Sequence, residues 1–255
     1  MLIIDHKYIF IHIPKTGGTY VTNVLEKLAG YGCIDLQIYS GKEKHAGLSK
    51  ALKLFHGENS SEPKALASIR EPVLHYVSRY NFRWWQSPHF WKQTISLKYP
   101  SFPNLTFDEF VDAINDYTVR KTNRTKFLEM CLEHNIGNCS FNIISKLGRR
   151  PFKSETPSSI LHDLKQRTDQ GNLFLLNTKQ LTDNLGSFLT KNFQLKKNIL
   201  ENALKEQKLP KADARLNKKL DLKPYIKVNE VSEATYNKIK QKECLIDQLI
   251  AHISS

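Results

Sequence analysis

Apolar residues along the chain follow two periodicities, which predict strands and helices in alternation. Three short runs rich in β-branched and aromatic residues have the length of buried strands. Each is followed by a stretch in which apolar residues recur every three or four positions, as on one face of a helix. The strand and helix pairs are 8–13 with 21–28, 65–69 with 73–82, and 173–176 with 181–193. This order predicts an α/β domain with a central parallel sheet and crossover helices.

Further helices are predicted between and after these pairs. They cover 48–55, 107–114 behind a Thr106–Glu109 capping box, 124–147 with a break near 137–138, and 232–253. We predict one continuous domain over 1–255 with two insertions. One is an aromatic and basic insert at 83–104, and the other is a lysine-rich loop at 201–227.

The loop after the first strand has the composition of a phosphate cradle. Lys15 precedes the adjacent glycines Gly17 and Gly18, and Thr16 and Thr19 add hydroxyl groups. A strand, a glycine loop and a helix together direct backbone N–H groups and a helix N-terminus at an anion. The ATP-binding and GTP-binding loop has Lys and Ser or Thr after its last glycine, and no such G-K-[ST] occurs in the chain. The dinucleotide fingerprint G-x-G-x-x-G is also absent from this loop.

A second group of polar residues follows the strand at 65–69. Arg70 stands at the carboxyl end of that strand, where open α/β sheets bind ligands. Pro72 fits the first turn of the following helix, and Ser78 lies eight positions after Arg70. Since arginine grips phosphate with two parallel hydrogen bonds, Arg70 is a second candidate anion ligand.

These two segments together resemble the signatures of sulfotransferases that use 3′-phosphoadenosine 5′-phosphosulfate (PAPS). The similarity is to the carbohydrate branch of heparan and chondroitin enzymes, and in particular to its soluble bacterial members. The resemblance implies a P-loop-like three-layer α/β/α fold with a central parallel sheet. It implies that the 5′-phosphosulfate is bound by the loop and the start of its helix. These residues are Pro14, Lys15, Thr16, Gly17, Gly18, Thr19 and Tyr20.

The resemblance also assigns Arg70 and Ser78 to the 3′-phosphate, which the product 3′,5′-ADP (PAP) keeps. The family's basic loop before the last helix folds over the cofactor, so Lys218, Lys219 and Lys227 are loose candidates for that role. No metal is expected, and the cysteines and histidines lack the spacing of zinc ligands.

Sulfuryl transfer needs a cation at the leaving phosphate and a base at the acceptor hydroxyl. By analogy with phosphoryl transfer, charge builds on the bridging oxygen, and Lys15 at the loop entry is the candidate for stabilising it. His45 is the predicted general base, because related bacterial sequences carry a histidine there before a short helix. Glu71, His75 and His89 are alternatives, whereas His12 within the strand is expected to pack in the core.

The formal net charge of +13 favours anionic partners, although charge alone ranks them weakly. The insert at 83–104 interleaves aromatic and cationic residues, which suits sugar rings, an adenine wall or a small satellite core. We expect a carbohydrate or acidic glycan as acceptor and no nucleic acid. The alternatives are a kinase-like phosphotransferase that uses Mg²⁺ and ATP, and a noncatalytic polyanion-binding module.

Four scattered cysteines favour free thiols in a reducing compartment, with Cys131–Cys139 as the alternative pair. The sequence has no signal peptide and no apolar stretch long enough to cross a membrane, so a cytoplasmic location is expected. The oligomeric state stays open.

Overall fold

A mixed β-sheet forms the centre of the computed structural model, which describes all residues except 56–61, 121–128, 130, 149–155, 206–224 and 255. Within the described residues this sheet has five strands in the order β3-β1-β2-β4-β5. They are β1(Leu2–Ile4), β2(Tyr8–Ile11), β3(Leu36–Ile38), β4(Lys64–Ile69) and β5(Leu173–Asn177). Strands β2, β4 and β5 pair in parallel, which confirms the three strands expected from the apolar runs.

Two further strands, β1 and β3, which were not predicted, extend the sheet beyond β2. Strand β1 is antiparallel to both of its neighbours, β2 and β3. The chain reverses between β1 and β2 through a short turn in which Asp5 and His6 have positive φ and the Lys7 N–H donates to the Ile4 carbonyl at 3.0 Å. Three residues can join antiparallel strands only, because a parallel pair needs a long crossover.

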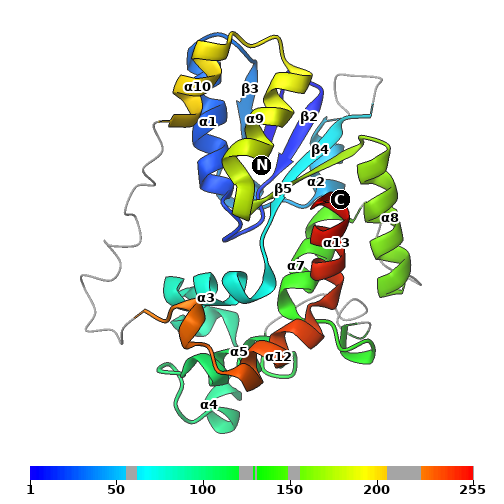
Figure 1. Cartoon of the computed structure of the whole chain (residues 1–255). Helices are drawn as coiled ribbons and strands as arrows, with labels where there is room; N and C mark the ends of the chain where they lie inside the picture. The colour runs from blue at the N-terminus through cyan, green and yellow to red at the C-terminus, as the bar shows by residue number, and fades with distance from the viewer. Residues whose placement is uncertain (56–61, 121–128, 130, 149–155, 206–224, 255) are drawn as a thin grey trace.

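Helices cover both faces of the sheet and make three layers (Figure 1). Alternate residues of each strand point to opposite faces, so Phe10 packs in one core and Ile9 and Ile11 in the other. The first core contains α1(Gly18–Gly30), α9(Leu181–Asn192) and α10(Lys197–Lys205). The second core contains α2(Leu48–Phe55), α7(Asn138–Leu147), α8(Pro157–Asp169) and α13(Cys244–Ser254).

A second group of helices lies across the end of the sheet at which β2 and β4 finish (Figure 1). It comprises α3(Pro72–Phe82), α4(Ile95–Lys98), α5(Phe107–Asn115) and α12(Glu233–Lys242). The predicted capping box at the start of α5 is confirmed, because the Thr106 and Glu109 side chains each bond the other's backbone N–H. Short 3₁₀ turns occupy Gly41–Glu43, Trp84–Gln86, Pro88–Phe90, Thr178–Gln180 and Val228–Glu230.

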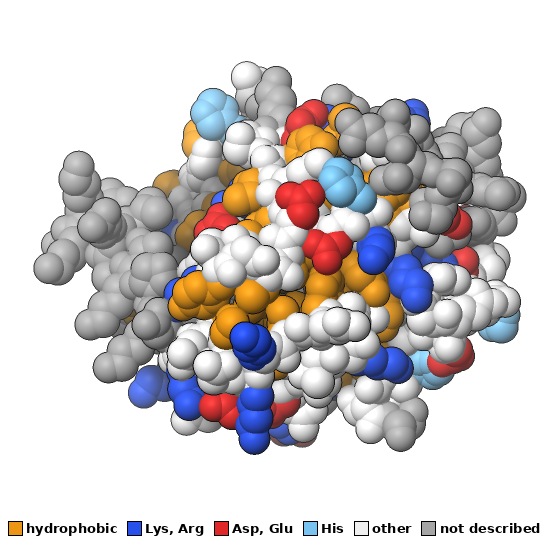
Figure 2. Space-filling view, turned by 90° about the horizontal axis from the view of Figure 1, so that it is seen from above, with side chains coloured by type: hydrophobic (Ala, Val, Ile, Leu, Met, Phe, Trp, Pro, Cys, Tyr) orange, Lys and Arg blue, Asp and Glu red, His pale blue; other side chains and the backbone are white. Residues whose placement is uncertain are grey.

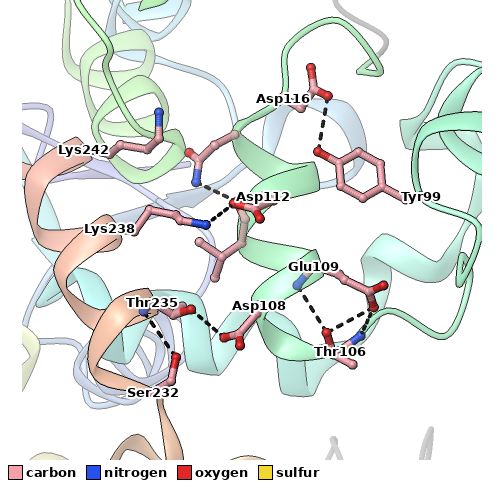
Figure 3. A network of polar contacts seen from close by, with 12 residues as sticks. Tyr99, Thr106, Asp108, Glu109, Asp112, Asp116, Ser232, Thr235, Lys238 and Lys242 are labelled. Atoms are coloured by element: carbon pink, nitrogen blue, oxygen red, sulfur yellow. Dashed lines mark hydrogen bonds and ion pairs between the residues drawn. The ribbon is translucent and has the colours of Figure 1, made fainter.

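Acidic residues on α5 bind the C-terminal part of the chain to this group. Asp108 accepts a hydrogen bond from Thr235 at 2.6 Å, and Asp112 lies 2.7 Å from the Lys238 ammonium (Figure 3). The Asp112–Lys238 pair is partly exposed and worth at most about 1 kcal/mol. Its main effect is to orient α12, which also packs on α3.

The single helix expected over 232–253 is broken in the structure into α12 and α13. The break is at Glu243, whose side chain is completely buried. Its carboxylate accepts hydrogen bonds from the backbone N–H groups of Cys139 at 2.8 Å and Ser140 at 2.7 Å, and from the Tyr76 hydroxyl at 2.6 Å. Glu243 therefore caps the N-terminus of α7, where a carboxylate is favourable. The periodicity of 232–253 carries no sign of this distant contact.

The largest rings of the segment 83–104 belong to the core. Trp85 and Trp91 are buried, and each indole N–H donates to a backbone carbonyl, those of Tyr80 and Trp85 respectively. For these two residues the satellite-core interpretation is confirmed. The predicted helix break near 137–138 is also confirmed, since α7 begins at Asn138.

Surface charge is mixed where it can be followed. Seen from above, Lys and Arg side chains are interspersed with acidic and apolar ones around a central hydrophobic patch (Figure 2).

All four cysteines are free, and Cys131 and Cys139 are buried. Within the described ranges, no helix has the length and apolarity needed to cross a bilayer. The same ranges contain no cluster of three or more His, Cys, Asp and Glu residues suited to holding a metal.

Candidate active site

The two polar segments singled out in the sequence meet at the carboxyl ends of neighbouring parallel strands. Strand β2 leads into the loop that starts α1, and β4 leads into α3, with Ile11 opposite Ala67. Side chains from the second segment bind the first. The Ser68 and Thr16 hydroxyls lie 2.9 Å apart, and the Arg70 guanidinium donates to the Lys15 carbonyl at 3.2 Å.

His75 makes the third of these connections. Its Nε2 lies 3.0 Å from the Pro14 carbonyl, which can only accept, so Nε2 carries the proton. The ring is 1% exposed, and burial, with the nearby Arg79, lowers the pKa of His75 to about 3. His75 is therefore a neutral donor at pH 7. Its Nδ1 has no hydrogen-bond partner among the described residues.

The backbone of the loop is held in a strained, open conformation. Lys15 has a φ of +67°, in the left-handed region that is unfavourable for a side-chain-bearing residue by about 1–2 kcal/mol. Gly17, with a φ of +82°, is the N-cap of α1 and supplies no side-chain cap to the first N–H groups of that helix. An uncapped helix N-terminus behind a positively charged residue is suited to binding an anion.

Both glycines are required by their surroundings. A Cβ on Gly18 would collide with the His12 ring, and one on Gly17 would collide with Leu181 at the start of α9. The third parallel strand therefore also contributes to the site, because α9 follows β5 through the turn at Thr178–Gln180. Gly17 is half-buried and Gly18 is buried against this packing, so neither position has room for a side chain.

Lys15 and Arg70 occupy different positions at this junction. The Lys15 ammonium lies 3.9 Å from the centre of the Phe82 ring, at the far end of α3. Arg70 is half-buried, and burial lowers its pKa from the ordinary value, an effect that the neighbouring Glu71 opposes. Ser78 is half-buried on α3, between Arg70 and Phe82 in sequence. Arg70 thus precedes the first turn of α3, whereas the Lys15 ammonium contacts its last residue.

The other predicted loop residues divide into exposed and internal side chains. Pro14 and Thr19 are exposed. Thr16 is completely buried and donates to the Ile13 carbonyl at 2.8 Å in addition to its contact with Ser68. The Tyr20 hydroxyl lies 3.1 Å from Thr182 on α9. The side chains of Thr16 and Tyr20 therefore hold the loop and α1 in place.

His45 reaches the same loop from the opposite side. Its ring stands edge-on to that of His12, with 4.8 Å between centres, and its Nδ1 lies 3.4 Å from the His12 carbonyl. His12 is buried, as expected, and burial lowers its pKa to about 3. His45 is exposed overall, but the part of the ring against His12 is covered, and this burial lowers the pKa of His45. Both rings are neutral at pH 7.

The hydrogen bond to His12 selects one tautomer of His45. Because a carbonyl only accepts, the His45 Nδ1 must donate, and Nε2 then carries a lone pair. Among the alternative bases, Glu71 caps α3 by accepting from the Leu74 N–H at 2.8 Å and also lies 3.6 Å from the Lys240 ammonium. His89 is exposed on the turn Pro88–Phe90.

Sequence reasoning missed the contact between Lys15 and Phe82 and the role of Ser68. Phe82 stands four positions after Ser78, which places both on one face of a helix, so its location was available from spacing alone. Ser68 is completely buried within β4, and nothing in its neighbours signals a hydroxyl partner 52 positions earlier. Lys218 and Lys219 lie outside the described residues, whereas the Lys227 N–H bonds the Glu230 carboxylate at 2.8 Å.

This arrangement defines an α/β protein in which the glycine loop after β2 is held by hydrogen bonds from residues of β4 and α3. The family model described as "Sulfotransferase family" matches residues 2–151, a range that contains both motifs, His45 and Phe82. The chain therefore belongs to the sulfotransferase family, whose enzymes transfer a sulfuryl group to an acceptor. Neither the curated proteins nor the solved structures provide a match to this chain.

Proposed function

We propose that the protein transfers the sulfuryl group of PAPS to a hydroxyl group, or an amine, of a carbohydrate acceptor. The observation that carries this proposal is the hydrogen bond from Arg70 to the Lys15 carbonyl, which joins the two anion-binding motifs into one site. A donor with phosphate groups at both ends needs two such centres at a fixed separation. A ligand with a single phosphate group would need only one such centre.

The residues present fit this donor. The uncapped N-terminus of α1 and the side chain of Lys15 would hold the 5′-phosphosulfate, with Gly17 and Gly18 allowing close approach. Arg70 and Ser78 would hold the 3′-phosphate. PAPS supplies the activated sulfuryl group when it is bound. The proposal requires no metal ion.

Lys15 and His45 have complementary roles in the proposed transfer. A bond forms between the acceptor oxygen and sulfur while the bond between sulfur and the bridging phosphate oxygen breaks. Lys15 stabilises the negative charge that develops on the bridging oxygen. The lone pair on His45 Nε2 takes the proton of the acceptor hydroxyl, and the Nδ1 bond to His12 keeps that lone pair available.

A glycan acceptor fits the remaining features of the chain. The net charge of +13 favours an anionic partner, and the segment 83–104 presents aromatic and cationic side chains near the end of α3. The mixed charges visible in Figure 2 give no support to a continuous polyanion-binding surface on that face.

Calorimetric titration with PAP, ATP–Mg²⁺ and heparin tests the donor assignment. We expect PAP to bind at least about tenfold more tightly than ATP–Mg²⁺, because Arg70 and Ser78 have a 3′-phosphate partner only in PAP. Preference for ATP–Mg²⁺ would instead indicate a phosphotransferase. Binding of heparin alone, with steep salt dependence, would indicate a polyanion-binding module.

Transfer itself is tested by incubating the protein with isotopically labelled PAPS and a panel of glycans. Mass spectrometry would detect the added sulfate. If PAP binds and every glycan stays unmodified, the carbohydrate acceptor is wrong while the donor assignment stands.

A further inference from the structure

Exposed aromatic side chains occur at the end of α3 and in the turns that follow it, and one of them, Phe82, lies against Lys15. The buried rings of Trp85 and Trp91 belong to the core, but Phe82 is 36% exposed and Phe90 is 46% exposed. Trp84 is partly buried and meets Phe90 edge-on, with 4.4 Å between ring centres. Single exposed apolar residues are ordinary, but an exposed ring in contact with a cation of the candidate site indicates a binding surface.

Phe82 connects this surface to the chemistry of the site. Its ring centre is 3.9 Å from the Lys15 ammonium, close enough for a cation–π contact. In the proposed transfer Lys15 must contact the bridging oxygen of the donor, and an ammonium engaged there cannot keep the same position over the ring. Donor binding would therefore uncover the face of Phe82 beside the sulfur atom, where the acceptor has to lie.

We propose that Phe82 forms an acceptor subsite for the ring of a saccharide; this inference rests on the proposed function. The C–H face of a pyranose packs on an aromatic ring, while its hydroxyl groups project from the rim toward neighbouring groups. Stacked on Phe82, such a ring presents a hydroxyl to Lys15 and the sulfur.

The polarity of the surface favours a sugar over an aromatic alcohol. Phe82 and Phe90 are between a third and a half exposed, so a ring bound on them keeps one edge in water. Arg83 is half-exposed, and His89 and Lys92 are exposed between the same rings. Hydroxyl and carboxylate groups at the edge of a sugar ring can bond these side chains, whereas a phenol offers little to them.

The same contact predicts the order in which the ligands bind. With Lys15 on its face, Phe82 is less available to a saccharide in the protein without donor. Binding of PAP should therefore strengthen saccharide binding by about two- to fivefold, which is the range expected for the release of one exposed cation–π contact.

Titration of the saccharide into PAP-loaded protein tests the subsite. The probes are heparosan hexasaccharide, which is acidic, and maltohexaose, which is neutral; binding is followed by saturation-transfer NMR and calorimetry. We expect Phe82→Leu to raise the Kd of the bound saccharide about three- to tenfold. Phe82→Tyr, which keeps the ring, should restore it. Leu97→Ala is the matched control, since Leu97 is 84% exposed on α4.

Each result decides between the inference and its rivals. Equal saccharide affinity in Phe82→Leu and the unchanged protein would overturn the subsite, and so would binding of 4-nitrophenol in place of both saccharides. If PAP binds but neither saccharide does, this inference fails and the donor assignment survives. If PAP does not bind, the proposed function fails first. The thermal midpoint of Phe82→Leu, compared with that of Phe82→Tyr, separates lost binding from lost folding.

Discussion

The proposed donor side and the proposed acceptor side of the site are built in different ways. The donor side is the loop from His12 to Gly18, held by Ser68, Arg70 and His75 at 2.9, 3.2 and 3.0 Å. The acceptor side consists of His45, attached by one 3.4 Å contact, and exposed rings near the end of α3. The loop residues proposed to bind the donor are thus held by several hydrogen bonds, whereas the residues proposed to contact the acceptor are exposed and less constrained.

Removal of the Lys15 cation should have one of the two largest effects on this comparison, the other being the loss of His45. Lys15→Ala should reduce kcat by about 10³-fold, because one preorganised group that stabilises developing charge contributes this much. Single-turnover transfer from labelled PAPS measures the loss. Lys27→Ala, at the opposite end of α1, is the control and should retain activity. A kcat within a few-fold of normal in Lys15→Ala would end the assignment of Lys15 as the catalytic cation.

Substitution of His45 tests whether the general base lies on the proposed acceptor side. His45→Gln should lower kcat by about 10²–10⁴-fold and abolish the acid limb of the pH profile. Because burial lowers the pKa of His45 from 6.5, activity in the unchanged protein should fall only below pH 6.5, as the imidazole gains its proton. His162→Gln, on the exposed face of α8, serves as the control. An unaltered pH profile in His45→Gln would assign the base elsewhere.

Substitution of Arg70 tests the proposed donor side through ligand binding alone, because Arg70 takes no part in the proposed transfer step. Arg70→Ala should weaken PAP binding by about 2–4 kcal/mol, because it removes a half-buried charge from its phosphate partner. Ser78→Ala, which removes one neutral donor, should weaken it by only about 1 kcal/mol. Calorimetry measures both. Equal PAP affinity in Arg70→Ala and the unchanged protein would contradict the 3′-phosphate assignment.

The dependence of protein stability on acid pH should show the smallest effect. It tests whether His75 is held as a buried, neutral ring on the donor side. The unfolded chain binds a proton on His75 near pH 6.5, but the folded protein does so only near pH 3. Stability is therefore fully present above pH 6.5 and falls by roughly 1.4 kcal/mol per pH unit for this group between the two values. Denaturant titrations at pH 7, 6 and 5 measure the slope, and His75→Asn should reduce it. An unchanged slope would show that His75 is not buried as a neutral ring.

Local sequence patterns were sufficient to predict the features that depend on consecutive residues. The Lys15 loop, the Arg70 motif, the three parallel strands and the capping box at Thr106 were all predicted from spacing. The antiparallel strand β1 was not predicted, because three residues carry too little periodicity. The break at Glu243 was not predicted, because its cause is a carboxylate bonded to α7, far away in the sequence.

The sequence by itself determined the family of the protein and predicted the class of its ligand. Glycines beside a lysine, and an arginine directly after a strand, indicate a candidate phosphate site from the sequence alone. They do so because the backbone geometry of such a site is set by consecutive residues. Only the tertiary structure decided that Arg70 and His75 hold the Lys15 loop, that His12 orients His45, and that Phe82 lies against the Lys15 ammonium. These contacts join residues tens of positions apart, and packing alone brings them together.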